Sequence, residues 1–382
     1  MSSESGRGTT PKSPAAPNEA ARYQLPSLSD GANLARLAVI GVVVAGLAAA
    51  FAATGGWFTP HHLTPARIVD TFEKVNGPHP GFRRNHAKGV CVTGTFASNG
   101  QGERLSKAVV FQQGTVPVMG RLSLAGGMPD IPDGPAGVRS MALSFRLPDG
   151  EEWRTGMIVL PVFPFKDAKA LYQQLAASEP DPATGKPDPA KMKDFAEHNP
   201  ETLAALKIIS AQPFSTGFEN ASFNGLNAFR FVDAAGTVTP VRWAMVASDP
   251  FVAEAPDQKV ASDKNYLFDA LLARLGQGPV QWHLMVTLGL PGDPTGNATI
   301  AWPAEREKVD VGTLTINHAE SEAAGNCRDI NYDPLVLPSG IEPSDDPLLS
   351  ARSAAYAQSF TRRSGETKQP SAVQVPDSGK AP

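Results

Sequence analysis

The sequence predicts an α+β fold, preceded by one apolar helix that is long enough to cross a membrane. Runs of β-branched and aromatic residues between positions 89 and 160 are separated by Gly, Pro and Asp-Gly turns, which is typical of a sheet. Helical patterns occupy the middle of the chain, and residues 37–58 are almost entirely apolar. The 35 Gly and 35 Pro among 382 residues agree with a fold rich in loops.

The N-terminal region is predicted to be a tail followed by an anchor. Residues 1–32 are rich in Ser, Gly, Pro and Ala without hydrophobic periodicity, so we expect a disordered tail. The apolar run predicts a single transmembrane helix over 33–58, with Trp57 and Phe58 at the membrane interface. A cleaved signal peptide is the alternative, but this run begins late and exceeds the usual apolar region of about 7 to 15 residues.

The distribution of basic residues predicts the orientation of this anchor. Arg7, Lys12, Arg22 and Arg36 precede the span, whereas the next basic residue is Arg67. Because positive charge is retained on the cytoplasmic side, the N-terminal tail is expected in the cytoplasm. The sequence therefore predicts a single-pass protein of the inner (cytoplasmic) membrane whose large C-terminal domain faces the periplasm.

The rest of the chain is predicted to form one domain over 59–365, with a disordered C-terminal tail over 366–382. We expect four helices, the last with a proline in its first turn, at 167–177, 190–198, 200–211 and 347–360. Strands are expected on both sides of the helical middle, at 90–96, 108–112, 138–145, 153–160, 227–232, 238–246 and 280–288.

Charge and cysteine content exclude some classes of function. The formal net charge is only -4 and no long basic run is present, so nucleic acid is not an expected partner. Cys91 and Cys327 are too few for a disulfide framework and lack the spacing of a zinc site. They could pair in an oxidising compartment, although two separate buried thiols are the simpler interpretation. The adjacent His61 and His62 are interpreted as incidental.

Three segments carry residues suited to chemistry. The segment GFRRNHAKGVCVTG at 81–94 contains Arg83 and His86, and VPVMGRLSLAG at 116–126 contains Arg121 and Ser123. The third, YDPLVLPSGIEPSDDPLLSARSAAY at 332–356, ends in Tyr356. Taken alone, the histidine is more often structural, and the second segment could be an ordinary amphipathic strand. Together they resemble the catalase superfamily runs R-x-x-H-A-K-G, P-I-x-V-R-F-S and F-D-P-x-x-x-P-P-G-I-E-P-S-P-D-x-x-L-x-x-R-x-x-x-Y.

This resemblance is nearest to the compact catalase-related peroxidases and spans residues from about 65 to 363. It implies a catalase-like antiparallel β-barrel with flanking helices and a haem b cofactor whose iron is held by Tyr356. By the same resemblance, His86 is the distal base and Ser123 its hydrogen-bond partner. The residues expected to bind the cofactor, apart from the ligand itself, are the arginines Arg83, Arg121, Arg352 and Arg363.

The choice of tyrosine can also be argued from the residues. A phenolate ligand requires loss of a proton, and a cation four residues earlier on a helix favours the ionised form. Tyr332 follows Arg328 at this spacing and Tyr356 follows Arg352. However, the Asp333-Pro334 pair directly after Tyr332 disfavours a helix there. The sequence therefore favours Tyr356.

The chain departs from the family pattern at three positions. The usual distal asparagine is replaced near Val159, a histidine on the proximal side is replaced by Asn227, and the histidine after the tyrosine is replaced by Phe360. In large catalases the asparagine helps to position a second peroxide, so we expect reduction of hydrogen peroxide or organic hydroperoxides with a small organic electron donor and little or modest catalase activity. Alternatives are a true catalase, a hydroperoxide isomerase and a haem carrier or sensor. The oligomeric state stays open, with a homodimer as one option.

Overall fold

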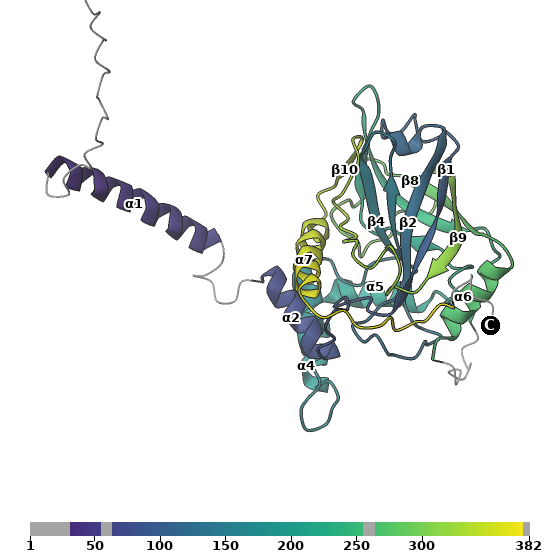
Figure 1. Ribbon diagram of the computed structural model, residues 1–382, viewed down its shortest axis with the longest axis horizontal. Helices are drawn as coiled ribbons and strands as arrows, with labels where there is room; N and C mark the ends of the chain where they lie inside the picture. The colour runs from purple at the N-terminus through teal and green to yellow at the C-terminus, as the bar shows by residue number, and fades with distance from the viewer. Residues whose placement is uncertain (1–30, 55–62, 255–263, 377–382) are drawn as a thin grey trace, which may run out of the picture. The chain divides into compact units, whose positions relative to one another are not determined.

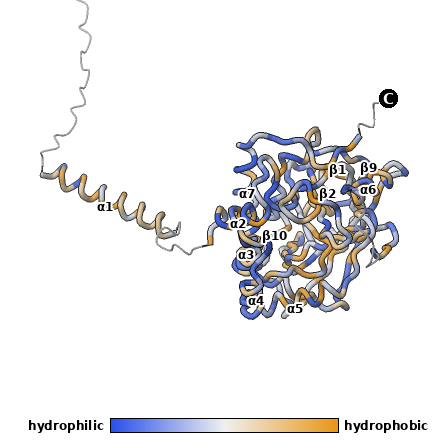
Figure 2. The backbone as a smooth tube through the Cα atoms, turned by 90° about the horizontal axis from the view of Figure 1, so that it is seen from below, coloured by the Kyte–Doolittle hydropathy of each residue, from blue (hydrophilic) through white to orange (hydrophobic). Residues whose placement is uncertain are grey.

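The structure is a computed structural model that describes residues 31–54, 63–254 and 264–376. The chain divides into two units, residues 1–62 and 63–382. Within the first, α1 (Gly31–Thr54) is long and apolar enough to cross a membrane, and apolar residues occur along its whole length (Figure 2). It overlaps most of the predicted span, whereas positions 55–58 and most of the predicted N-terminal tail lie outside the described residues.

The second unit is built on an antiparallel sheet that closes into a barrel (Figure 1). The strands follow the order β10-β6-β7-β5-β4-β3-β2-β1-β9-β8, and β7 also pairs with β8, which closes a ring of eight strands. The expected antiparallel barrel is therefore confirmed. The strand bounds are β1 (Gly89–Ser98), β2 (Gly114–Leu124), β3 (Arg139–Arg146), β4 (Glu152–Ile158), β5 (Phe223–Asn224), β6 (Phe229–Val232), β7 (Val238–Ala247), β8 (Val280–Leu288), β9 (Lys308–Glu320) and β10 (Ile341–Pro343).

Aromatic side chains fill the barrel. Trp153 stacks on Phe145 with ring centroids 4.7 Å apart and meets Trp243 edge to face at 5.1 Å. The indole of Trp243 donates a hydrogen bond of 3.0 Å to Thr155 Oγ1, so its polar atom is satisfied inside the barrel. Because side chains alternate between the two faces of a strand, the residues next to these core positions face outward. That outer face is available to build a site.

Helices cover part of the outer face, and their bounds are α2 (Pro65–Asn76), α3 (Ala168–Ala177), α4 (Pro189–His198), α5 (Pro200–Ser210), α6 (Tyr266–Gly276) and α7 (Pro347–Ser364). The helices α2, α3 and α7 pack against one another, whereas α6 contacts β9. In Figure 1, α2 and α7 accordingly lie on one side of the barrel and α6 on the other. Side-chain oxygens of Thr64, Asp167 and Asp346 cap the first turns of α2, α3 and α7.

Two expectations about secondary structure are corrected. The segment 108–112, predicted as a strand, instead contains a short 3-10 helix, Val109–Phe111. Its apolar residues Val110 and Phe111 are buried from this single turn. The C-terminal tail was predicted to be disordered, but its described part, 366–376, packs against the domain. Val373 is 0% exposed within the core, and Ser371 Oγ accepts a 2.5 Å hydrogen bond from Ala323 N. The polar composition of this segment gave no indication that Val373 and Val375 pack on the core.

The cysteines form a disulfide, which corrects the preference for two separate thiols. Cys91 lies on β1 and Cys327 in the segment after β9, with a Cα–Cα distance of 5.3 Å. Both cysteines are fully buried. They are 236 residues apart in sequence, so only the fold brings them together. The bridge fixes the segment that leads to Tyr332 and α7 against the outer face of the barrel.

Candidate active site

A cavity of about 440 Å³ lies between the outer face of the barrel and the helices. The helices α2, α3 and α7 contribute apolar side chains to its wall, among them Ile68, Leu171 and Phe360. All the site residues expected from the sequence line this one cavity: Arg83, His86, Arg121, Ser123, Arg352, Tyr356 and Arg363. Residues from three distant parts of the chain are thus brought together at a concave site.

His86 enters the cavity from the loop before β1, on a strained backbone. Its φ of 58° is left-handed, and the other non-glycine residue with positive φ in the described chain, Leu226, also lines the cavity. Such conformations are costly for residues with a Cβ and are often found at functional sites. Asn85 Oδ1 supports the turn by accepting hydrogen bonds from His86 N at 3.0 Å and Gly126 N at 2.8 Å.

The imidazole of His86 is neutral in this environment. Burial lowers its pKa to about 3, and the positive charges of Arg121, Arg352 and Arg83 act in the same direction. A neutral imidazole can accept a proton at one ring nitrogen while the other is held by a hydrogen bond. His86 therefore has the charge state that a general base needs.

The hydrogen bond expected from Ser123 is instead formed by Ser140. In the described structure Ser140 Oγ lies 2.9 Å from His86 Nδ1. Ser123 on β2 and Ser140 on β3 are directly opposite each other in the antiparallel register, so they share one face of the sheet. Ser123 lines the cavity, and the neighbouring strand brings a second hydroxyl, that of Ser140, to the ring. The motif alone could not reveal this partner, since strand pairing determines it.

Tyr356 lies on α7, with Arg352 one turn earlier. Arg352 Nη2 lies 3.3 Å from the Tyr356 hydroxyl oxygen and can donate to it, and the guanidinium is 5.6 Å from the ring centroid. Arg352 Nη1 also donates to Asn227 Oδ1, while Asn227 Nδ2 donates to Asp346 Oδ2 at 2.7 Å. Because Asp346 caps α7, this chain of bonds fixes Arg352 relative to the helix start.

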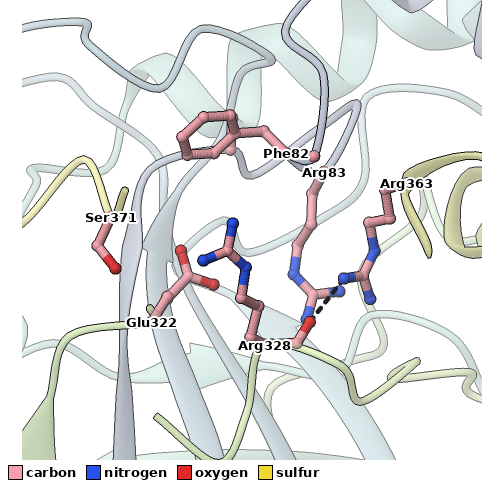
Figure 3. A pocket seen from close by; sticks show the side chains of 8 residues that line it. Phe82, Arg83, Glu322, Arg328, Arg363 and Ser371 are labelled. Carbon is pink, nitrogen blue, oxygen red and sulfur yellow. Dashed lines mark hydrogen bonds between the residues drawn. The ribbon is translucent and has the colours of Figure 1, made fainter. Parts of the chain in front are cut away.

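A second group of arginines lies at another part of the cavity. Arg121 makes a paired salt bridge with Glu322, with N–O distances of 2.7 and 2.9 Å. Arg83 Nη2 donates to the carbonyl oxygens of Cys327, Arg328 and Ile330. Arg363 Nη1 donates to the same Arg328 oxygen at 2.6 Å, and Figure 3 shows both arginines converging on this backbone. Gly89 permits this arrangement, since a Cβ there would lie 2.6 Å from the Arg121 guanidinium carbon.

This group carries excess positive charge. Burial lowers the pKa of Arg83 to about 10 and that of Arg363 to about 9, both still protonated at neutral pH. Glu322 balances one of the three charges, while Asp329, 4.0 Å from Arg363, is largely exposed and paired with Lys368. Moreover, Arg83 Nε is buried and has no hydrogen-bond partner in the part of the chain that the structure describes. Two positive charges and an unused donor suit a ligand with two carboxylates.

The three predicted departures occupy different environments. Val159 packs against the barrel core, whereas Ile158 and Leu160 beside it line the cavity, so this wall is apolar. Phe360 lines the cavity and Asn227 holds Arg352. Sequence reasoning missed Asn224, which also lines the cavity and donates from Nδ2 to the Leu160 carbonyl at 3.0 Å. It also missed Glu322, for which no motif gave a signal.

Comparison with known proteins identifies the family, because the catalase family model matches residues 54–379. The chain belongs to the catalase family. It is 38% identical to a catalase-related peroxidase of Synechococcus elongatus, over 86% of this chain and 93% of that one. It is 32% identical to a catalase-related peroxidase of Mycolicibacterium paratuberculosis, over 79% and 96%. This member of the catalase family is thus similar over nearly the full length of both relatives, and it is an oxidoreductase that acts on peroxide.

Solved structures agree on the fold. A fungal catalase superimposes with a TM-score of 0.68 at 17% identity, covering 81% of this chain and 66% of that one. A bacterial catalase gives a TM-score of 0.66 at 20% identity, covering 80% and 62%. Catalase family proteins depend on haem, which supports a haem cofactor here. The residues fit it: the cavity is largely apolar, and the arginine group can accept two carboxylates.

Proposed function

We propose that the protein is a membrane-anchored haem peroxidase that reduces hydrogen peroxide or organic hydroperoxides with a small organic electron donor and has little catalase activity. The observation that carries the proposal is the shared cavity, in which a neutral His86 and the Arg352–Tyr356 pair are held together. The cofactor is proposed to be haem b, with Tyr356 as the iron ligand and Arg83 and Arg363 binding its carboxylates. Arg121 is proposed to contribute mainly charge, since its Nε and Nη2 already donate to Glu322.

When bound, the haem supplies the metal at which peroxide is activated. In the proposed mechanism His86 Nδ1 donates to Ser140 Oγ, which leaves a lone pair on Nε2. Nε2 removes the proton from one peroxide oxygen and returns it to the other, the leaving oxygen. Arg352 donates to the Tyr356 oxygen and places its positive charge beside the proposed ligand atom. Ile158 and Leu160 give this wall apolar side chains, and the Asn224 amide beside them donates to the Leu160 carbonyl, so we propose that no asparagine orients a second peroxide here.

The wild-type enzyme loaded with haem should oxidise a phenolic or dye donor with peroxide at a rate well above its evolution of oxygen from peroxide alone. The reason is that the apolar wall does not help to orient a second peroxide. Electron transfer from the donor is therefore favoured over disproportionation of peroxide. Donor absorbance and an oxygen electrode measure the two rates on the same preparation. Dominant oxygen evolution would assign the protein as a catalase instead. Consumption of a fatty-acid hydroperoxide without any donor would indicate an isomerase.

The proposed location is the cytoplasmic membrane, with the enzyme facing the periplasm. The charge asymmetry around the apolar helix supports this orientation. The Cys91–Cys327 disulfide also supports it, because disulfides persist in oxidising compartments and are rare in the cytosol. An anchored enzyme should remain in the membrane fraction, with α1 uncleaved.

Protease added to intact spheroplasts should therefore digest the catalytic domain. An immunoblot against the domain gives the readout, and a cytoplasmic protein that survives the treatment serves as the control. Loss of the domain only after permeabilisation would show that the orientation is inverted. A soluble periplasmic product that lacks the residues up to α1 would show a cleaved signal sequence.

A further inference from the structure

Tyr332 presents a buried hydroxyl group that the mechanism above does not use. Its side chain packs against the Cys91–Cys327 disulfide and is 4% exposed. The residue lines the same cavity as Tyr356. Its hydroxyl has no hydrogen-bond partner among the described residues. Burial raises the pKa of this phenol, so at neutral pH the hydroxyl keeps its proton and can donate it in a hydrogen bond.

The surroundings of this hydroxyl are positively charged. The Arg83 guanidinium lies 5.6 Å from the Tyr332 ring centroid, and Arg121 is also near enough to act on the phenol. Of these two arginines, Arg121 donates to Glu322 from Nε and Nη2, whereas Arg83 Nε is buried and has no hydrogen-bond partner among the described residues. Two unused donors, one charged and one neutral, therefore lie at the same part of the cavity wall.

Unused buried donors are uncommon because each loses its bond to water without a replacement. The feature that would satisfy both is an acceptor with two oxygens and negative charge, which describes a carboxylate. At the corresponding position, the run that the sequence resembles has phenylalanine, so the hydroxyl is a departure from that run. The disulfide holds the tyrosine in place, since Cys327 precedes it by five residues and packs against its ring.

We propose that the Tyr332 hydroxyl and Arg83 Nε together bind one carboxylate of the haem, which makes Tyr332 a cofactor-binding residue. The inference rests on the haem-binding part of the proposed function. The neutral Tyr332 hydroxyl adds affinity for the carboxylate. It adds no charge to this part of the cavity, which already contains three arginines. Arg83 and Tyr332 would then donate the hydrogen bonds that Arg121 Nε and Nη2 cannot give to the haem carboxylate, because these atoms donate to Glu322.

The test is the rate at which haem leaves the full-length protein in detergent, measured by its transfer to excess apomyoglobin. Tyr332→Phe should release haem about tenfold faster or more, because a hydrogen bond to a charged group is lost, and tenfold corresponds to about 1.4 kcal/mol. The matched control is Tyr266→Phe, which removes a buried hydroxyl that likewise has no partner within the described residues but does not line the cavity. Its release rate should equal that of the wild type.

Haem dimethyl ester, in which both carboxylates are blocked, provides the second arm. The ester oxygens carry no charge and accept hydrogen bonds more weakly, so with this probe the difference in release rate between wild type and Tyr332→Phe should become much smaller. Propionate bands in the resonance Raman spectrum should differ between the two proteins only for the unmodified haem complexes. Equal release of unmodified haem by both proteins would overturn the inference. So would an undiminished difference with the ester, since the effect would then be structural. Failure of the wild type to bind haem at all would instead contradict the proposed function.

Discussion

Replacing His86 by alanine should slow the peroxide-dependent step about 10²- to 10⁴-fold, the usual contribution of general acid–base catalysis. We expect this loss because His86 is placed to act as a base. Ser140 holds the ring, and burial together with the nearby arginines keeps it neutral. Haem binding should be nearly unaffected because the proposed ligand and carboxylate partners lie on other residues. Stopped-flow mixing with peroxide, followed through the first change in the haem spectrum, measures the rate.

A second histidine provides the matched control for this variant. His283 on β8 pairs with Asp310 at 2.8 Å, is partly exposed and does not line the cavity. His283→Ala should react with peroxide at the wild-type rate. If His86→Ala also reacts at that rate, another group must move the proton and the assignment of the base is wrong.

The low pKa of His86 also predicts the pH dependence of this step. A base acts in its neutral form, and a pKa of about 3 keeps the ring neutral down to about pH 4. The rate of reaction with peroxide should therefore stay nearly constant between pH 7 and pH 5. A histidine with the ordinary pKa of about 6.5 would be largely protonated at pH 5 and the rate would fall in proportion.

Replacing Tyr356 by phenylalanine should abolish the phenolate-to-iron absorption and most of the peroxidase activity. Tyr356 and Arg352 share one face of α7, and the bonds through Asn227 to Asp346 hold the arginine independently of the tyrosine. The variant should therefore fold, and circular dichroism can confirm this. Absorption of the haem complex measures the loss of the ligand, and donor oxidation measures the loss of activity.

The matched control for this prediction is Tyr332→Phe. That variant loses a hydroxyl in the same cavity, but its complex should retain the phenolate absorption even if haem leaves faster. Retention of the phenolate bands in Tyr356→Phe, together with their loss in Tyr332→Phe, would exchange the roles of the two tyrosines.

Local patterns predicted the parts of the structure that local sequence controls. The proline at the start of α7 and the Arg352–Tyr356 spacing lie in one helix, so periodicity and capping were enough to place them. The runs that contain His86 and Arg121 identified residues that share the cavity, although 35 positions separate them along the sequence. The resemblance to a family supplied the barrel itself.

Partners across strands and segments could not be predicted in this way. Ser140 reaches His86 because β3 pairs with β2, and Glu322 reaches Arg121 because the chain turns back after β9. Likewise, the Cys91–Cys327 bridge depends on the meeting of two distant segments. Each of these contacts depends on tertiary packing, about which composition and periodicity carry no information.

The resonance Raman spectrum of the wild-type haem complex, excited in its ligand-to-metal absorption band, tests the central claim most directly. The account predicts phenolate vibrations that shift when the protein is grown with ring-deuterated tyrosine and that are absent from Tyr356→Phe. A spectrum without phenolate vibrations, or with vibrations of histidine or cysteine coordination, would contradict the assignment of Tyr356 as the iron ligand.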